Sequence, residues 1–211
     1  MKSEAARVKP RRYLQGARAQ AAEATARRIV DAFFARLMKQ WFDEITLDRV
    51  AEDAGVTVQT VVRRFGGKEG LLAETVQIMG GQVNARRATP PGDVGRLVKN
   101  LFEDYEQIGD AVIRLLALEP RHAALKKFLE FGRCWHRDWI AGQFEVELAR
   151  LDASARKRAL DALVIATDVY AWKLLRRDMG RSVSAARTTM NQLICATISG
   201  FSSSHAPGDQ R

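Results

Sequence analysis

The segment from Thr46 to Phe65 constrains the fold more than any other part of the sequence, because it encodes two short helices on either side of a glycine. Thr46 offers a side-chain oxygen as the N-cap of a helix over residues 47–54. Gly55 comes where the chain must leave the right-handed helical conformation, and glycine adopts positive φ without strain. Thr57 can cap a second helix over residues 58–65. Two short helices joined by such a tight turn predict a helix-turn-helix.

The second helix of this pair has a polar outer face. Val61 and Phe65 face inward at helical spacing, which leaves glutamine, threonine and arginine side chains outside. Such side chains hydrogen-bond base edges and phosphates, and a helix-turn-helix places its second helix in the major groove. The alternative is an ordinary surface helix with solvated arginines, but that helix does not need the frame of Ala51, Gly55 and Val61. The predicted DNA-binding residues are Thr46, Thr57, Gln59, Thr60, Arg63, Arg64 and Lys68.

The charge of the chain also favours a polyanionic partner. Its 34 Lys and Arg residues against 25 Asp and Glu residues give a net charge of +9. We predict that residues 1–18 form a mobile basic arm, and the alternative is a solvated tail that only aids solubility. Against a single acidic residue, Glu4, this segment carries the basic residues Lys2, Arg7, Lys9, Arg11, Arg12 and Arg18.

Other locations and ligand classes are not supported. Cys134 and Cys195 lie in apolar helical patterns without the spacing of a disulfide framework or a metal site, which favours a reduced, cytoplasmic protein. No apolar run approaches the ~20 residues of a membrane span, and no secretion signal follows the first charges. Gly67 and Lys68 resemble part of a nucleotide-binding phosphate loop, but Glu69 follows where that motif needs Ser or Thr.

The sequence assembles no catalytic or metal-binding unit. Cys134, His136 and Asp138 are close along the chain, but side chains two residues apart on a helix diverge. The histidines have no pattern of Ser, Cys and carboxylate residues around them that forms a catalytic unit. We therefore expect a protein that is not an enzyme and that uses no metal and no cofactor.

The rest of the chain predicts an all-α protein. Ala, Leu, Arg, Glu and Gln dominate long intervals free of proline, and apolar residues recur there at helical spacing. Residues 201–211 are polar and are predicted to be disordered. Besides the helix pair, the predicted helices span residues 17–39, 93–109, 112–118, 123–144, 155–177 and 184–199.

Residues 28–76 resemble the DNA-binding domain of TetR-family transcriptional repressors. The family's apolar-Asp-Ala first helix and aromatic-Asp turn correspond to residues 29–32 and 42–43. Its Thr-capped second helix ending in Ala-Gly-Val corresponds to residues 46–56, and its third helix, ending in Arg-x-Phe-Gly-x-Lys-Glu, ends over residues 63–69. The resemblance implies an N-terminal three-helix helix-turn-helix domain over residues 19–70. It also implies a C-terminal helical domain for effector binding and dimerisation over residues 71–200.

Five residues depart from the family pattern. Trp41 lies where a glycine commonly ends the first helix, and Val62 replaces a tyrosine that commonly contacts phosphate. Val58 and Gln59 replace a common Lys-Gly pair, and Arg64 replaces a common histidine. Gln59 adds a side chain that can make a bidentate contact to adenine. Arg64 and the basic arm are expected to offset the lost tyrosine and lysine.

The C-terminal region carries two candidate binding surfaces. Aromatic side chains suit a small-molecule pocket, with simple core packing as the alternative. This set contains Tyr105, Trp135, Trp139, Tyr170 and Trp172. In the family, the last two long helices pair with those of a second subunit, and the apolar stripes of residues 160–175 and 186–198 suit that role; an intramolecular core is the alternative. The candidate interface residues are Leu163, Leu174, Met190, Leu193, Ile194 and Thr197.

These features predict a homodimeric repressor that binds a palindromic DNA operator and is released by a small-molecule effector. The competing interpretation is a helical interaction or enzyme module that kept the fold but lost operator reading, because Val58 and Val62 replace contact residues.

Overall fold

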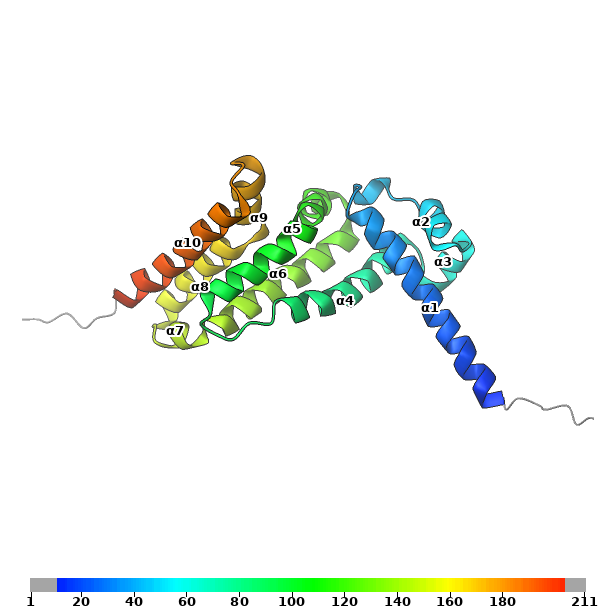
Figure 1. The fold of residues 1–211 in the computed structure, drawn as a ribbon, viewed down its shortest axis with the longest axis horizontal. Coiled ribbons are helices and arrows are strands. Elements are labelled where there is room, and N and C mark those ends of the chain that lie inside the picture. The colour runs from blue at the N-terminus through cyan, green and yellow to red at the C-terminus, as the bar shows by residue number, and fades with distance from the viewer. Residues whose placement is uncertain (1–10, 204–211) are drawn as a thin grey trace, which may run out of the picture. The chain divides into compact units, whose positions relative to one another are not determined.

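The computed structural model describes residues 11–203, in which helices are joined by turns and no β-strand occurs (Figure 1). The all-α prediction is therefore confirmed. The chain divides into two compact units, residues 1–75 and residues 76–211. The division falls inside one helix, α4 (Lys68–Arg86), whose first turn also contains the predicted boundary between residues 70 and 71.

The N-terminal unit is built around the C-terminal half of its first helix. Ile29, Val30 and Phe33 are buried there, and α2 packs beside this half of α1 (Figure 1). The ring of Phe33 meets the ring of Phe42 edge to face, with centroids 6.5 Å apart. The elements are α1 (Arg11–Leu37), the short 3-10 helix η1 (Phe42–Glu44), α2 (Leu47–Ala54), α3 (Val58–Phe65) and the first turns of α4.

The first helix begins earlier than the sequence indicated. It starts at Arg11, whereas we predicted a helix from about residue 17 with a mobile arm before it. Residues 17–28 are mostly Ala, Arg, Gln and Glu, which have high helix propensity, and no proline follows Pro10 until residue 90. Residues 11–18 of the predicted arm are therefore helical, and residues 1–10 lie outside the described part of the chain.

Trp41 causes no strain in the turn after α1. Its φ of −70° and ψ of 144° are extended values that any residue adopts. Among the described residues, positive φ values belong only to glycines. Because this turn needs no left-handed residue, tryptophan replaces the glycine common in the family without a backbone cost.

The C-terminal unit packs its helices around α5. Leu97, Leu101 and Phe102 of this helix are buried in one core with Leu163 and Ile194. The predicted tail is helical at residues 201–203, and residues 204–211 lie outside the described part. The elements are α5 (Val94–Leu118), η2 (Glu119–Arg121), α6 (Ala123–Gln143), α7 (Glu145–Ala149), α8 (Ala153–Thr167), α9 (Val169–Lys173), the π-helical η3 (Leu174–Asp178) and α10 (Val183–Ser203).

Helix α5 runs without a break where the sequence predicted two helices, residues 93–109 and 112–118. A Cβ added at Gly109 would lie 2.5 Å from the ring of Trp172, which is fully buried. Gly109 therefore makes room for a large side chain, and it does not end a helix. A residue larger than glycine at position 109 would exclude the ring of Trp172.

The predicted helix over residues 155–177 is instead three consecutive segments, α8, α9 and η3. The break lies at Asp168, whose backbone is extended with φ −70° and ψ 154°. Its carboxylate accepts a hydrogen bond of 2.8 Å from the Tyr170 N–H and so caps α9. Burial raises the pKa of Asp168.

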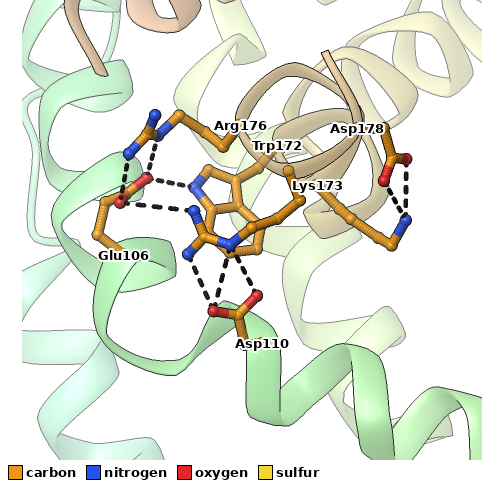
Figure 2. Close-up of polar contacts among 7 residues, drawn as sticks. Glu106, Asp110, Trp172, Lys173, Arg176 and Asp178 are labelled. Carbon is orange, nitrogen blue, oxygen red and sulfur yellow. Dashed lines mark hydrogen bonds and ion pairs between the residues drawn. The ribbon is translucent and has the colours of Figure 1, made fainter. Parts of the chain in front are cut away.

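Ion pairs connect α5 to the π-helical segment η3 (Figure 2). The Glu106 carboxylate accepts hydrogen bonds from Arg176 Nε at 2.6 Å and from the Trp172 indole N–H at 2.8 Å. The Asp110 carboxylate accepts from Arg177 Nε at 2.9 Å, and the Arg177 guanidinium lies 4.5 Å from the centroid of the Trp172 ring. These contacts fix a helix type that is rare and often marks functional sites.

Candidate nucleic-acid interface

The helix-turn-helix forms as its capping residues predict. The Thr46 hydroxyl accepts a hydrogen bond from the Arg49 N–H at 3.4 Å at the start of α2. Gly55 ends this helix in the left-handed conformation, with φ 63° and ψ 44°. The Thr57 hydroxyl then accepts from the Thr60 N–H at 3.2 Å, which caps α3. The structure places both helices at the predicted bounds because each has its own start and stop signal.

The register of α3 leaves three long polar side chains unengaged. Val61 is fully buried, whereas Gln59, Arg63 and Arg64 are exposed. No hydrogen bond or ion pair with another residue between 11 and 203 engages these three side chains. They are therefore available to a partner on the outer face of the helix.

The threonines of the predicted set also have structural roles. Thr46 and Thr57 are exposed but serve as N-caps. The Thr57 and Thr60 hydroxyls also bond to each other at 3.0 Å. Each Thr hydroxyl still has acceptor capacity for an outside donor.

Lys68 has a different role from the predicted phosphate contact. Its ammonium group donates to the backbone carbonyls of Phe42 at 2.8 Å, Ile45 at 2.9 Å and Asp43 at 3.3 Å. It also lies 4.6 Å from the centroid of the Phe42 ring. Since an ammonium group has three donors, these carbonyls use all of them. Burial lowers the pKa of Lys68. We therefore revise the assignment: Lys68 ties the start of α4 to the η1 turn.

Two further contacts position the helix-turn-helix, and no sequence pattern indicated either of them. Arg36 of α1 donates to Asp53 of α2 through a 2.6 Å ion pair, and this hydrogen bond lowers the pKa of Asp53. A Cβ added at Gly70 would lie 1.8 Å from the backbone oxygen of Phe65. Glycine is thus required where the first turn of α4 passes the end of α3.

Three of the five predicted pocket aromatics lie together around a buried arginine. The Arg87 guanidinium lies 5.1 Å from the ring centroid of Tyr105 and 5.4 Å from those of Trp135 and Trp139. The two indole rings are stacked, with an interplanar angle of 4°. Tyr105 is buried and both tryptophans are partly exposed.

Of the other two pocket aromatics, Trp172 lies beside Tyr105, with ring centroids 5.9 Å apart, whereas Tyr170 does not join the group. Trp172 fills the core beside Gly109, and Tyr170 is 55% exposed. The pocket role of both stays a prediction, and α9 is a separate short helix whose side chains do not continue the pattern of α8.

Arg87 belongs to a buried polar network that the sequence pattern did not indicate. Its Nε donates to Asp104, which has no exposed surface, at 2.8 Å. The Thr167 hydroxyl donates to the Leu163 carbonyl at 2.8 Å, so it accepts at 3.0 Å from His136 Nε2, and this assigns the histidine tautomer. Burial, and then the charge of Arg87, lowers the pKa of His136 to about 3, so the ring is neutral. The Tyr105 hydroxyl donates to the Thr167 carbonyl at 3.0 Å, and burial raises its pKa.

The predicted dimer residues fall into two groups. Leu163, Met190 and Ile194 have at most 1% of their surface exposed within the subunit's own core, so the interface prediction is wrong for them. They lie in one core with residues of α5, and the sequence pattern alone could not distinguish this core from a second subunit. Leu174 and Leu193 are 52% and 47% exposed, and Thr197 is partly exposed.

The described residues hold no group of three or more His, Cys, Asp or Glu side chains that could bind a metal ion. Both cysteines are exposed and unpaired by a disulfide. Within residues 11–203, the helices all lack the combination of length and apolar character that crossing a membrane requires.

Comparison with solved structures supports the fold. A proposed TetR-family transcriptional regulator from Rhodococcus sp. is 17% identical over 82% of this chain and 98% of its own, with a TM-score of 0.67. A transcriptional regulator from Rhodococcus sp. Rha1 is 13% identical over 83% and 96%, with a TM-score of 0.66. The fatty acid degradation regulator FadR from Bacillus halodurans is 18% identical over 83% and 95%, with a TM-score of 0.58.

The sequence of the N-terminal unit identifies its family more directly. No curated protein matches the chain closely enough to count as a relative. Residues 29–75 match the family described as bacterial regulatory proteins, tetR family. This segment contains α2, α3 and the Lys68 contacts that hold them. The chain therefore belongs to the TetR family of bacterial regulatory proteins, with a DNA-binding helix-turn-helix at its N-terminus.

Proposed function

We propose that this transcriptional regulator is a repressor that binds a palindromic operator as a homodimer and leaves it when a small molecule binds the C-terminal unit. The observation that carries the DNA-binding part is the outer face of α3, where Gln59, Arg63 and Arg64 are exposed without partners among the described residues. The helix is capped at its N-terminus, the end that approaches the bases in this motif. Gln59 reads a base edge, and Arg63 and Arg64 bind phosphate or guanine.

Selection from a random duplex library with the purified full chain tests this assignment. One enriched inverted repeat is expected with the natural protein. Gln59→Ala is expected to relax the preference at one base pair in each half-site. No enrichment over random DNA would instead support a helical module that has lost operator reading, as the exposed Val62 in place of a phosphate-binding tyrosine suggests.

The homodimer forms through exposed apolar side chains near the C-terminus. Ile165 of α8 is 70% exposed, and Leu174 of η3 and Leu193 of α10 are about half exposed. Helix α10 packs against both α8 and η3, so these side chains are carried by adjoining elements. Exposed apolar groups on adjoining elements are typical of a protein interface.

Sedimentation analysis tests the dimer. We expect Leu193→Glu and Leu174→Glu to shift the protein towards monomer, because each places a charge in the interface. Val146→Glu is the matched control, since Val146 is 59% exposed on α7. A monomeric natural protein at micromolar concentration would remove the dimer from the proposal.

The effector binds at the Arg87 network. Burying the Arg87–Asp104 ion pair beside a neutral histidine costs desolvation free energy, and a role in specificity or function would explain why the pair is present. The partly exposed Trp135 and Trp139 give a ligand access to this network and an optical signal of its arrival. A ligand shifts a conformational equilibrium only through its different affinities for the two states. If the effector weakens operator binding by a given factor, operator DNA must therefore weaken effector binding by the same factor.

A ligand screen read by tryptophan fluorescence tests the effector site. An effector is expected to change the emission of the natural protein, to lower operator affinity, and to lose both effects in Trp135→Leu. Phe131→Leu on the same helix, where Phe131 is 65% exposed, is the control. An effector that releases DNA equally well from both variants would place the site elsewhere.

A further inference from the structure

The positive charge of the chain is concentrated at its N-terminus. Residues 1–28 contain eight Lys and Arg residues and two Glu residues, a net charge of +6 out of +9 for the whole chain. Five of these basic residues lie within α1, between Arg11 and Arg28. With Glu23 they give residues 11–28 a net charge of +4, on a helix that continues directly into the helix-turn-helix unit.

The same part of α1 has little contact with the unit that it precedes. Among the side chains that the structure describes, the first buried one is Ile29, and the residues from Arg18 to Ala24 are all exposed. Arg27 pairs with Asp31 at 3.0 Å, whereas Arg18 and Arg28 have no carboxylate partner within the described residues. Residues 16–28 contain only Gly, Ala, Arg, Gln, Glu and Thr. Residues 16–28 thus form a basic stretch of helix without large apolar side chains.

This stretch of helix has little packing to stabilise it. Most helical stability in proteins comes from tertiary packing, and none of the described side chains between residues 16 and 28 is buried. From Arg11 to Arg28 the helix rises about 26 Å at 1.5 Å per residue, which is about 8 base pairs of DNA at 3.4 Å each. A polyanion along this length would neutralise the charges and stabilise the helix.

The composition of the helix distinguishes between polyanions. A helix that lies on a membrane needs a face of large apolar side chains to insert, whereas residues 11–28 contain only Tyr13 and Leu14 of this kind. Duplex DNA needs only positive charge in a regular array, since its phosphates supply the binding energy. The helix also leads into the unit that carries α3, so the polyanion expected to bind it is the DNA that α3 binds.

We propose that residues 11–28 of α1 form a second, sequence-independent DNA contact, which lies along phosphates beside the operator half-site and gains helical order there. This inference rests on the proposed DNA-binding function. Arg18 and Arg28 supply the phosphate contacts among the described side chains. The contact adds affinity and salt dependence, and it leaves base preference to α3.

Two variants of the full chain separate charge from helical form. Arg18→Gln with Arg28→Gln removes two charges and keeps good helix formers, whereas Ala21→Pro keeps the charges and breaks the helix. Lys127→Gln with Lys157→Gln is the control, because it removes two exposed charges from the C-terminal unit. Binding is measured against salt concentration, on the operator with long flanks and on the operator trimmed to its half-sites.

On long-flanked DNA, the double arginine variant is expected to lose about 8-fold affinity per arginine at 0.1 M salt, with a salt slope shallower by about 0.9 per contact. Ala21→Pro is expected to weaken binding too, and to lose the gain in circular-dichroism helicity that DNA induces in the natural protein. Trimmed flanks should abolish the differences, and the control should match the natural protein.

Equal salt slopes for the arginine variant and the control would overturn the proposal. Unchanged binding by Ala21→Pro would overturn its helical part. Preferential binding of the natural protein to vesicles of anionic lipid over duplex DNA would assign the helix to a membrane instead. If the natural protein selects no operator, the proposed function is wrong. The proposed contact of α1 is still tested in that case, because it predicts that the arginine variant loses salt slope on random duplex DNA.

Discussion

Replacing Lys68 with Met should destabilise the N-terminal unit without weakening phosphate binding directly. Methionine keeps the length of the side chain but loses all three hydrogen bonds to the carbonyls of Phe42, Asp43 and Ile45. Phe42 and Ile45 are buried, with 2% and 1% exposure, so their carbonyls have little access to replacement water.

The size of the effect follows from these two buried bonds. A hydrogen bond to a charged group contributes about 1.5–3 kcal/mol, and partial exposure of the lysine places this case at the lower end. The free energy of unfolding of this unit should therefore fall by about 2–3 kcal/mol. Amide hydrogen exchange in α2 should accelerate by about 30- to 150-fold, because exchange reports the free energy of local opening.

Hydrogen exchange with the full chain measures this loss, and Arg64→Met is the matched control. Arg64 is exposed on α3 without a partner between residues 11 and 203, so its loss should leave exchange unchanged while it lowers DNA affinity and flattens the salt slope. Lys68→Met should keep the salt slope of the natural protein under conditions where the unit is folded. The reasoning is refuted if Lys68→Met exchanges like the natural protein and loses salt slope as Arg64→Met does.

Three other changes test separate parts of the structure. Gln59→Ala should cost roughly 1–3 kcal/mol on the best operator and barely change the melting temperature, and a large fall in melting temperature would place Gln59 in the core. Gly70→Ala should lower the melting temperature more than Gly80→Ala, because only the first added Cβ meets the Phe65 oxygen; equal melting would contradict this. Arg176 lowers the pKa of Glu106 from 4.5, so its contribution to stability is present above that pH and is lost as the pH falls. Glu106→Gln should therefore flatten the acid side of the stability profile in urea titrations, and an unchanged profile would show that the ion pair is not stabilising.

Local signals were enough to predict the helix-turn-helix. Thr46, Gly55 and Thr57 each act on their own backbone neighbours, so the residue type alone fixed where α2 and α3 begin and end. The buried position of Val61 followed from helical spacing for the same reason. The family resemblance added the role of this motif.

Features that depend on distant residues were not predictable from sequence. Gly109 resembled a helix end, but the ring of Trp172, 63 positions away, makes it part of a continuous helix. Lys68 was predicted to contact phosphate, but its ammonium group binds carbonyls of the turn after α1, which are distant in the sequence. The pairing of Arg87 with Asp104 likewise depends on how α5 packs. In each case the partner is set by tertiary packing, which a single sequence pattern does not encode.

The proposed function depends above all on α3 reading bases in the major groove, and the structure of the full chain bound to its selected operator measures this most directly. It should place α3 of each subunit in successive major grooves on one face, about 34–36 Å apart, with the Gln59 amide within hydrogen-bonding distance of an adenine edge. The proposed function is contradicted if α3 lies outside the groove, or if the Gln59 side chain faces its own protein while other residues read the bases.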